Sequence, residues 1–366
     1  MSASTNDGLA RLSRGDGGTD NAPPALSIVV VHWRAERDLA ALLAALPDDS
    51  RFEVVLVDNS GTFAPPRMDP SAQEAPRGEE VVAAPDRGAH EPAPRDETVV
   101  GGAATRAALR VVRPGANLGF GGGANLGVSV ASAPLLLVAN PDVRPEPGAL
   151  EALLAGFDAL PEAAGLAPRL VGVDGAPQTA WQLRALPRAA QLLQHALFRD
   201  AGRGAATEPA AGALVEQPAA AALALRRSAW ERLGGFDSTF HPAWFEDVDL
   251  ARRLAGIGGT IAYWPAATFR HGLGGSVAPL GYGAFLWHYH RNLGRYLRKH
   301  HGAMWAVTAR ALLVVGAVLR ALASPLRRPR RATSVGDALA GLATVALGAL
   351  SGWRRPRRLA RAEAGA

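Results

Sequence analysis

A β–α–β pattern near the start of the chain limits the fold more than any other feature. Residues 26–31 are an almost continuous run of β-branched residues, typical of a strand buried on both faces of a parallel sheet. Residues 36–46 repeat leucine at helical spacing, and residues 53–57 form a second apolar run. Strands joined by one helix lie parallel, with a right-handed crossover. The sequence therefore predicts an α/β fold with a mostly parallel sheet flanked by helices.

Polar residues follow both of these strands. His32 follows the first, and Asp58 and Asn59 follow the second. Because parallel sheets bind ligands beyond the carboxyl ends of their strands, this edge is the predicted binding edge. Asp58 is equally consistent with a turn residue that closes its strand, and the pattern leaves both interpretations open.

A glycine-rich segment at residues 115–127 follows a short strand predicted at 109–112. Glycines let backbone approach a ligand closely, and N–H donors at a helix start attract anions. Asn117 and Gly119 lie in its opening half. The spacing fits neither a dinucleotide fingerprint nor a P-loop. A flexible turn before a helix is the alternative interpretation.

Two further strand ends carry possible metal ligands. The strand at 134–139 is followed by Asn140 and Asp142, and His271 comes after a strand predicted at 261–264. A carboxylate together with a histidine can hold a hard divalent cation beside phosphate oxygens. We therefore expect Asp142 and His271 at the same edge as Asp58.

The predicted helix that starts at Glu246 carries three acidic residues in its first turn. Apolar residues recur at helical spacing from Val248 to Ala255, and Asp247 falls on that apolar stripe. Asp249 and Arg253 are spaced as an ion pair on the opposite face. A carboxylate aimed inward at a helix start either caps the helix or takes part in the chemistry of a site. The pattern taken alone favours a cap. Taken together with the polar residues at the other strand ends, it favours a site residue.

Composition separates the chain into an acidic body and a basic tail. There is no cysteine, which excludes disulfides, thiolate zinc sites and a cysteine nucleophile. From Phe285 onward fifteen Arg and Lys face two acidic residues, so this part carries +13 and the preceding 284 residues −7. Such a tail predicts an anionic surface as partner. Without a nucleic-acid motif, and with apolar runs nearby, anionic lipid is favoured and nucleic acid is not.

These patterns predict three parts. Residues 1–24 are polar and are expected to be a disordered leader; residues 25–300 form the main domain; residues 301–366 form a basic amphipathic helical tail. Residues 61–108, rich in Pro, Ala and Gly, are expected to be a disordered insertion. The tail's longest strongly apolar run, 311–319, is too short to span a bilayer. Its expected membrane-facing residues are Trp305, Leu312, Leu313, Leu319 and Leu322. Packing on the main domain, or a dimer contact, is the alternative for the tail.

In order along the chain, the motifs resemble those of the inverting nucleotide-sugar glycosyltransferases of family 2, which have the GT-A fold. The group most similar is the rhamnosyltransferase-like enzymes of bacterial cell-surface polysaccharide assembly. The resemblance covers about residues 26–300. Its motifs are Ser-Ile-Val-Val-Val at 27–31, Val-Asp-Asn-Ser at 57–60, Gly-Ala-Asn-Leu-Gly-Phe at 115–120, Asn-Pro-Asp at 140–142, Gly-Gly-Phe-Asp at 234–237, Glu-Asp-Val-Asp-Leu at 246–250 and Pro-Ala at 265–266 with His271.

The resemblance implies a role for each site residue. Asp247 corresponds to the catalytic base, supported by Glu246, and Asp142 and His271 correspond to ligands of Mg²⁺ or Mn²⁺. Asn140 stands where the family's Asp-X-Asp motif has its first aspartate, which is a departure. The residues implied in binding a UDP- or dTDP-sugar are His32, Asp58, Asn59, Asn117, Gly119 and Asn140.

The implied function is a metal-dependent, inverting hexosyltransferase. It would move a sugar, with rhamnose suggested, to a hydroxyl of a cell-envelope glycan or polyprenyl-linked acceptor. The leaving diphosphate needs positive charge, and the acceptor hydroxyl needs a base. The expected location is cytoplasmic, peripheral on the inner face of the plasma membrane. A nucleotide-sugar-binding protein without catalysis and a membrane-associated structural protein are the alternatives.

Overall fold

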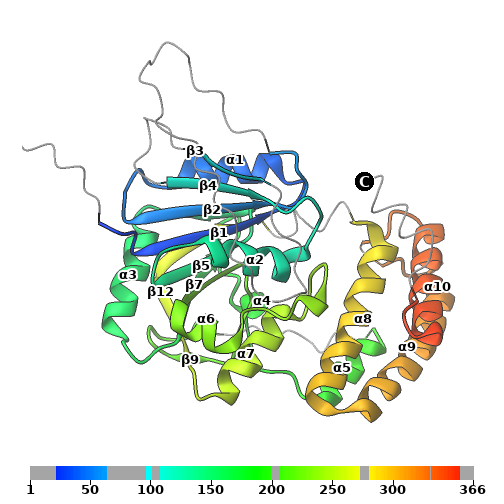
Figure 1. Cartoon of the computed structure of the whole chain (residues 1–366). Helices are drawn as coiled ribbons and strands as arrows, with labels where there is room; N and C mark the ends of the chain where they lie inside the picture. The colour runs from blue at the N-terminus through cyan, green and yellow to red at the C-terminus, as the bar shows by residue number, and fades with distance from the viewer. Residues whose placement is uncertain are drawn as a thin grey trace, which may run out of the picture.

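A ten-stranded sheet forms the centre of the protein (Figure 1). The computed structural model describes residues 22–63, 96–100, 108–198, 207–272, 280–329 and 331–354. The strands, in order across the sheet, are β3 (Asp96–Val100), β4 (Ala108–Arg113), β2 (Phe52–Asp58), β1 (Leu26–His32), β5 (Leu135–Ala139), β11 (Ala222–Arg226), β7 (Gly165–Val171), β12 (Ile261–His271) and β6 (Val143–Pro145), with β9 (Leu214–Val215) beside β12.

The sheet is parallel in one half and mixed in the other. Strands β4, β2, β1 and β5 all run parallel. Strand β11 runs antiparallel to both β5 and β7, while β7 and β12 are parallel again. The remaining edge strands β3, β6 and β9 are antiparallel to their neighbours. The predicted α/β class is confirmed, and the parallel half contains the predicted β–α–β unit.

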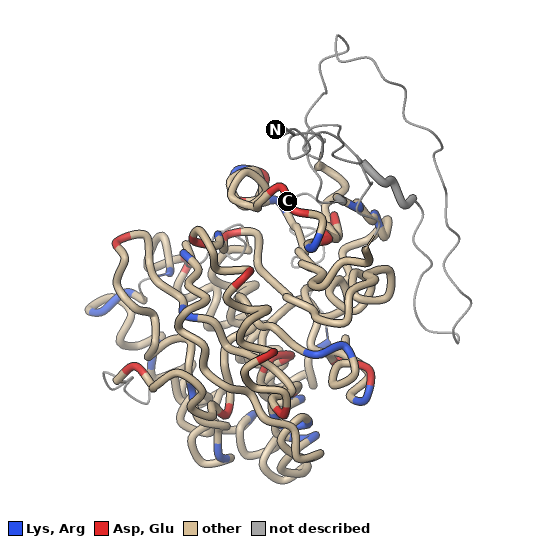
Figure 2. Tube along the Cα trace, turned by 90° about the vertical axis from the view of Figure 1, so that its left-hand side faces the viewer, with Lys and Arg blue, Asp and Glu red and all other residues tan. Residues whose placement is uncertain are grey.

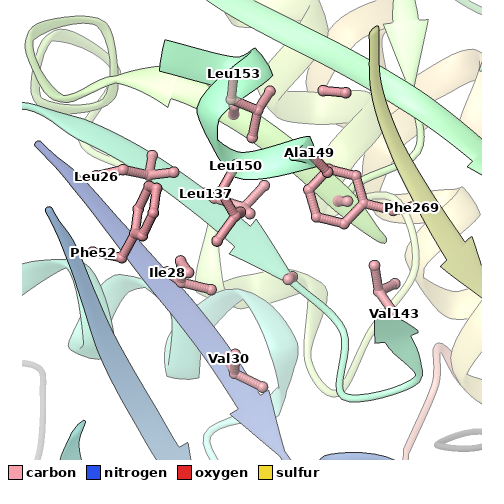
Figure 3. Close-up of a cluster of buried hydrophobic side chains, with 14 of the residues drawn as sticks. Leu26, Ile28, Val30, Phe52, Leu137, Val143, Ala149, Leu150, Leu153 and Phe269 are labelled. Atoms are coloured by element: carbon pink, nitrogen blue, oxygen red, sulfur yellow. The ribbon is translucent and has the colours of Figure 1, made fainter. Parts of the chain in front are cut away.

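Helices cover both faces of the sheet and enclose two apolar cores. Helices α1 (Glu36–Ala45) and α3 (Ala149–Ala159) pack on one face, and α2 (Gly119–Val130), α6 (Arg227–Leu233) and α7 (Glu246–Gly256) on the other (Figure 1). Along β1, Leu26, Ile28 and Val30 enter the first core (Figure 3), whereas Val29 and Val31 enter the second. Because both faces are buried, every position of the strand is apolar or, at Ser27 and His32, buried and polar.

A helical layer lies beside the sheet. It consists of α5 (Ala189–Ala196), α8 (Gly281–His301), α9 (Ala303–Ala323) and α10 (Val335–Ser351) (Figure 1). Leu293 of α8, Leu313 of α9 and Leu342 of α10 share a third core, which also includes Phe245 and Val248. The tail therefore packs on the main domain through one face, and the chain does not divide structurally at residue 300.

Helix α9 alone among the described helices is long and apolar enough to cross a membrane, with a mean hydropathy of 1.8. Arg310 and Arg320 bracket its most apolar part. Arg310 donates to Ala349 O at 2.7 Å and Arg320 to Phe198 O at 2.7 Å, so both arginines take part in helix packing. Core helices of globular proteins meet the same criteria, so length and composition alone assign no span.

Part of the segment predicted to be disordered forms a strand. Residues 96–100 make β3, antiparallel to β4 at the sheet edge. Thr98, Val99 and Val100 are good strand formers, which a prediction based on the average composition of a long segment misses. Residues 64–95 and 101–107 of that segment lie outside the described residues, as do residues 1–21 of the predicted leader.

Candidate active site

The parallel strands end together and bring their following residues to one edge. His32, the last residue of β1, is paired in register with Asp58, the last residue of β2. Strand β5 ends beside them, and the N–H of Asn140 then donates to Ala221 O at 2.8 Å. The structure thus contains the predicted edge, with Asp58 and His32 at the ends of neighbouring strands and Asn140 directly after the next strand.

The carboxylate of Asp58 organises the turn that follows it. Its Oδ1 accepts from the N–H of Gly61 at 2.9 Å and from the hydroxyl of Ser60 at 2.9 Å. Its Oδ2 accepts from the N–H of Phe63 at 2.9 Å and lies 3.7 Å from Nε of Arg113. The geometry therefore satisfies the turn interpretation of Asp58, and a direct contact with a nucleotide base stays a prediction.

Asn59 connects this turn to the glycine-rich segment. Its Nδ2 donates to Gly119 O at 3.1 Å, and its Oδ1 accepts from the N–H of Leu118 at 3.3 Å. The side chain of Asn117 accepts from the N–H of Gly119 at 2.8 Å. Asn59, Asn117 and Gly119, which are predicted to bind the nucleotide sugar, therefore belong to one hydrogen-bonded cluster.

Most of the glycine-rich segment is helix rather than loop. Helix α2 begins at Gly119, and its glycines let it approach the sheet. A Cβ on Gly123 would lie 2.7 Å from Cγ1 of Val31, and one on Gly127 would lie 2.4 Å from Cγ1 of Val29. Each interior glycine costs about 1 kcal/mol of helix propensity relative to alanine, and close packing offsets this. Local propensity predicts a loop here, and tertiary packing makes it a helix.

The segment that leads into α7 contacts the same cluster. It follows the short helix η1 (Ser238–Phe240), and Nε2 of His241 lies 3.0 Å from Asn117 O. The N–H of Phe120 donates to Pro242 O at 2.7 Å. A Cβ on Gly119 would lie 2.6 Å from Pro242 O, and the φ of Gly119 is +72°, so only glycine fits there. Residues 117–120 are called the donor loop below, because Asn117 and Gly119 are predicted to bind the sugar donor. This contact joins the donor loop to the residues before Glu246.

The backbone directly before Glu246 is strained. Trp244 and Phe245 both have φ of 76°, a left-handed conformation that bulky side chains rarely adopt. Each such residue costs about 1–3 kcal/mol and persists only where its surroundings hold it. Phe245 is the N-cap residue of α7 and makes no side-chain cap bond. The strain therefore sets the direction in which α7 begins.

Glu246 and Asp247 occupy different environments although they are adjacent. Glu246 is buried, and its Oε2 has no hydrogen-bond partner among the described residues. Burial, and secondarily the charge of Asp247, raises the pKa of Glu246 well above its usual range. The side chain of Asp247 is 16% exposed, and its Oδ1 accepts from the N–H of Val248 at 2.8 Å. The pair thus offers one buried carboxyl whose surroundings favour its protonated form and one partly exposed carboxyl.

Two residues near Asp247 were missed by sequence reasoning. Nε2 of Gln217 lies 3.3 Å from Oδ2 of Asp247, and a guanidinium nitrogen of Arg184 lies 3.8 Å from the same oxygen. They come from β8 (Leu183–Arg184) and β10 (Gln217–Pro218), which form a separate two-stranded sheet. Strands of two residues have no readable periodicity, so no local signal could have found them.

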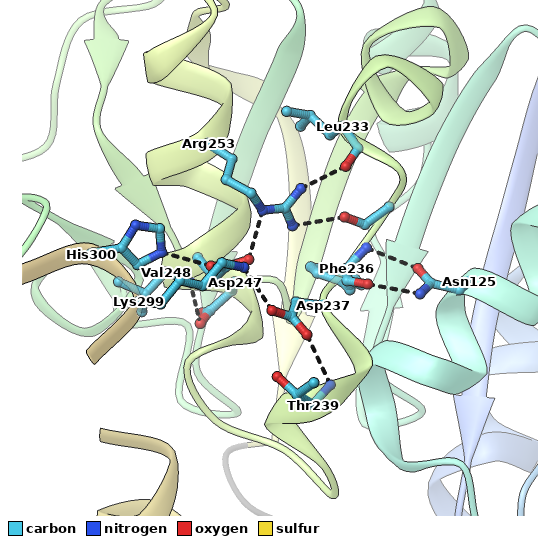
Figure 4. Close-up of polar contacts among 12 residues, drawn as sticks. Asn125, Leu233, Phe236, Asp237, Thr239, Asp247, Val248, Arg253, Lys299 and His300 are labelled. Atoms are coloured by element: carbon cyan, nitrogen blue, oxygen red, sulfur yellow. Dashed lines mark hydrogen bonds and ion pairs between the residues drawn. The ribbon is translucent and has the colours of Figure 1, made fainter. Parts of the chain in front are cut away.

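Asp249, predicted on the face of α7 opposite the apolar stripe, lies on a face that is itself buried. It is fully buried, and it accepts from Arg253, Lys299 and His300 at 2.7 Å each. Although burial acts to raise it, these hydrogen bonds, led by that from His300, lower the pKa of Asp249 to about 2. The predicted ion pair with Arg253 is confirmed. Figure 4 shows that the side chains of Arg253, Lys299 and His300 lie close together. Lys299 and His300 belong to α8, so this helix covers Asp249. No local sequence pattern could predict that cover.

Asp142 and His271 are brought together by the pairing of β6 and β12. Nε2 of His271 lies 3.6 Å from Oδ1 of Asp142, and both side chains are buried. Nδ1 of His271 lies 2.8 Å from Oε1 of Gln178, whose Nε2 donates to His271 O at 3.0 Å. Burial lowers the pKa of His271, against the opposing effect of Asp142. Gln178 thus fixes the ring from behind.

This pair fits a divalent cation that completes its shell elsewhere. Within the described ranges there is no group of three or more His, Cys, Asp or Glu residues that could hold a metal ion. If Nδ1–H of His271 donates to Gln178, Nε2 keeps a lone pair directed to the side of Asp142. Mg²⁺ commonly takes one or two protein ligands together with substrate phosphates and water. Asp142 and His271 therefore suit a metal ion that is also bound by a diphosphate.

His32 is the least satisfied polar residue at the edge. Its ring is fully buried, and neither nitrogen has a hydrogen-bond partner among the residues that the structure describes. Nε2 lies 3.8 Å from Oε1 of Glu36. Burial lowers the pKa of His32, although Asp58 and Glu36 act in the opposite direction. Buried polar atoms without partners are uncommon, and a role at a site is one reason for retaining them.

Comparison with known proteins identifies a relative. No family model matches the chain. The chain is 30% identical over 253 residues to the N-acetylglucosaminyl-diphospho-decaprenol L-rhamnosyltransferase of Mycobacterium tuberculosis, in strains CDC 1551 / Oshkosh and ATCC 25618 / H37Rv. The alignment covers 61% of this chain and 78% of the relative.

Solved structures also align with it at low sequence identity. Staphylococcus aureus TarS 1–349 in complex with UDP-GlcNAc is 16% identical, with a TM-score of 0.44 and coverage of 92% of this chain and 82% of TarS. The mannosyltransferase PcManGT from Pyrobaculum calidifontis, in complex with GDP-Man and Mn²⁺, is 15% identical, with a TM-score of 0.45 and coverage of 91% and 89%.

The relative and the arrangement of the motifs agree. The alignment spans more than two thirds of the M. tuberculosis enzyme, and the motifs lie in the family's order on an α/β sheet. The chain therefore belongs to the family 2 glycosyltransferases of GT-A fold, in their rhamnosyltransferase-like group.

Proposed function

We propose that this glycosyltransferase moves rhamnose from a dTDP- or UDP-sugar to a hydroxyl of a polyprenyl-linked cell-envelope glycan, with inversion at the anomeric carbon. The M. tuberculosis relative is named for L-rhamnosyl transfer to N-acetylglucosaminyl-diphospho-decaprenol. The observation that carries the proposal is the accessible carboxylate of Asp247, which is joined to the predicted donor loop through the segment 241–245.

In the proposed reaction Asp247 takes the proton of the acceptor hydroxyl. The acceptor oxygen then bonds to the anomeric carbon from the face opposite the diphosphate, while the bond to the diphosphate oxygen breaks and that oxygen keeps the electron pair. A single displacement inverts the configuration and needs no nucleophile from the protein. Gln217 and Arg184 contact only Oδ2 of Asp247, and they hold the carboxylate in place.

Buried Glu246 is proposed to support this base by carrying a proton. A second anion beside Asp247 would compete for the same proton and repel the donor phosphates. The burial of Glu246, which favours its neutral form, avoids that repulsion. This division of two adjacent carboxyls by environment resembles the acid and base assignments of other carboxylate enzymes.

The donor is proposed to lie against Asn59, Asn117, Gly119 and Asn140, with Asp142 and His271 at its diphosphate. A cation held by Asp142 and Nε2 of His271 would supply positive charge for the diphosphate as it leaves. The side chain of Gln178 holds His271 in the orientation that this requires. Mg²⁺ and Mn²⁺ are the proposed ions.

The reaction is proposed to take place on the cytoplasmic face of the plasma membrane, because the tail exposes a large apolar surface. Leu313, expected at the membrane, is instead buried in the third core, whereas Leu319 and Leu322 are exposed. Figure 2 marks the charged residues; from residue 285 on, Asp337 is the one acidic residue in the part that the structure describes. Exposed large apolar side chains on α9 and α10 are Met304, Val307, Val315, Val318, Leu319, Leu322, Val335, Leu339, Leu347 and Leu350, and exposed arginines nearby are Arg327, Arg328, Arg331 and Arg354.

The proposed function is tested with the purified full-length protein. Thermal shift with UDP- and dTDP-sugars, with Mg²⁺ or Mn²⁺, identifies the donor, because a ligand that binds only the native state raises the unfolding midpoint. Transfer to a polyprenyl-diphospho-N-acetylglucosamine is then measured with that donor, and nuclear magnetic resonance assigns the anomeric configuration of the product. Binding without any transfer or hydrolysis would favour the alternative, a nucleotide-sugar-binding protein without catalysis.

A further inference from the structure

Asn292 of α8 holds the strained segment that precedes the acidic pair. Its side chain is fully buried. Nδ2 donates to Phe240 O at 2.7 Å and to Ala243 O at 2.9 Å, and it lies 3.3 Å from Trp244 O. A single amide therefore satisfies carbonyls at both ends of the bend that leads to the left-handed Trp244 and Phe245.

Asn292 belongs to a polar stripe that runs along α8. Arg291 donates to His241 O and Arg295 to Thr239 O. One turn further on, Lys299 pairs with Asp237 at 2.6 Å and with Asp249 at 2.7 Å. Spacings of three and four residues place these side chains on one face of the helix. That face covers the chain from the Gly-Gly-Phe-Asp motif to the first turn of α7.

The bend held by Asn292 has contacts on both sides of the site. On the side of the donor loop, Nε2 of His241 lies within hydrogen-bond distance of Asn117 O, and Pro242 O accepts from the N–H of Phe120. On the other side Phe245 O accepts from the N–H of Asp249 in the first turn of α7 at 2.9 Å. A change in the bend would therefore move Asp247 relative to the loop at 117–120.

We propose that Asn292 is a positioning residue for the transfer reaction. Its amide keeps Trp244 and Phe245 left-handed and so fixes the carboxylate of Asp247 against the donor loop. The inference rests on the proposed role of Asp247 as base. It assigns part of the catalytic geometry to α8, a helix outside the sheet and outside every motif of the family resemblance.

The test variant is Asn292→Asp, which keeps the shape and replaces the amide donor by an oxygen. We expect kcat at saturating substrates to fall at least about tenfold with a smaller change in KM, since a displacement of about 1 Å can cost on the order of 10²-fold. Amide hydrogen exchange in residues 237–249 should rise, while exchange in α3 stays unchanged. If Asn292→Asp does not fold, Asn292→Ser retains one short donor and should show the same two effects in milder form.

Ser27→Ala is the matched control. Ser27 is also fully buried; its Oγ donates to Oε2 of Glu53 at 2.6 Å and accepts from the N–H of Ala133 at 3.0 Å, at the opposite end of β1 from the site. The control should lower the unfolding midpoint without changing kcat, measured well below both midpoints. A loss of kcat in Asn292→Asp no larger than in the control would assign Asn292 a role in stability alone and overturn the proposal.

The exchange measurement separates this inference from the proposed function. Unchanged exchange in residues 237–249 in a folded Asn292→Asp variant would show that Asn292 does not hold the bend, whatever the enzyme does. If the wild-type protein transfers no sugar, the proposed function fails, and the positioning role fails with it. Increased exchange together with reduced kcat supports both.

Discussion

Nε2 of His271 lies 3.6 Å from Oδ1 of Asp142, although one residue ends β12 and the other precedes β6. The antiparallel pairing of these two strands places the side chains together, and Gln178 fixes the imidazole from its other nitrogen. The structure thus joins two residues that the sequence could only predict to share an edge.

Removal of metal should abolish transfer. A chelator should stop the reaction, and added Mg²⁺ or Mn²⁺ should restore it. Asp142→Asn should weaken the metal-dependent thermal shift by the nucleotide donor, since a neutral amide is a poorer ligand than a carboxylate. Asp158→Asn, an exposed aspartate on α3, is the control and should behave as wild type. Full activity in the presence of chelator would exclude the metal role of Asp142 and His271.

Asp247→Asn should retain donor binding and lose transfer. The amide keeps the shape of the side chain and its position beside Gln217 but cannot accept the acceptor's proton. Loss of a general base costs ~10²–10⁴ in rate. Steady-state transfer and thermal shift by the donor, measured on the same preparation, check the two halves of the prediction. Turnover within about tenfold of wild type would contradict the base assignment.

Glu246→Gln should stabilise the fold, most clearly above pH 4.5. The raised pKa means that folded Glu246 keeps a proton that the unfolded chain releases. Stability therefore falls as pH rises from about 4.5 towards the folded-state pKa, and glutamine removes this dependence. Thermal midpoints of variant and wild type between pH 4 and pH 8 should diverge as pH rises. The exposed Glu231→Gln on α6 should show no such divergence, and parallel curves for Glu246→Gln would contradict a protonated Glu246.

Asp249→Asn should destabilise the fold with the opposite pH dependence. The folded-state pKa of about 2 lies below the unfolded value of 3.8, so the carboxylate's contribution is fully present above pH 3.8 and is lost as pH falls towards 2. Breaking a buried charge cluster on one side costs about 3–5 kcal/mol. Chemical denaturation at pH 7 measures that loss, and acid titration should narrow the gap to wild type. A constant gap from pH 6 to pH 2 would argue against the ion cluster.

The apolar face of the tail should bind anionic vesicles. Full-length protein should float with vesicles that contain phosphatidylglycerol and should dissociate from them at high salt. It should not bind neutral vesicles. A double variant, Leu319→Glu with Leu322→Glu, should stay in solution, because it places charges on the exposed face. Val173→Glu changes a similarly exposed apolar residue far along the chain from the tail and is the control. Loss of self-association in the double variant, with no vesicle binding by wild type, would instead assign the face to a second copy of the chain.

Truncation of the chain after residue 300 is a poor test of membrane binding by the tail. Leu293 and Tyr296 of α8 pack with Leu313 and Leu342 of the later helices, and truncation would expose this core. Substitutions on the exposed face leave the shared core intact, so any change in membrane binding reports on the surface itself.

The sequence determined the β–α–β unit and the order of the motifs. The run at 26–31 predicted a strand because burial on both faces requires apolar side chains, and the polar residues at or directly after the ends of β1, β2 and β5 predicted the edge. Asp142 and His271 were predicted together from strand ends alone. These signals are local, so each is readable within a few neighbouring residues.

Only the tertiary structure decided the remaining features, because each depends on a partner distant in sequence. Gly123 and Gly127 read as loop residues, yet they are helical where α2 meets Val29 and Val31. The helical pattern placed Asp249 opposite the apolar stripe but could not show that α8 covers that face, and Asn292 has no motif of its own. Helical periodicity reveals which residues share a face, but what covers that face is set by long-range packing, and the geometry around Asp247 depends on that packing.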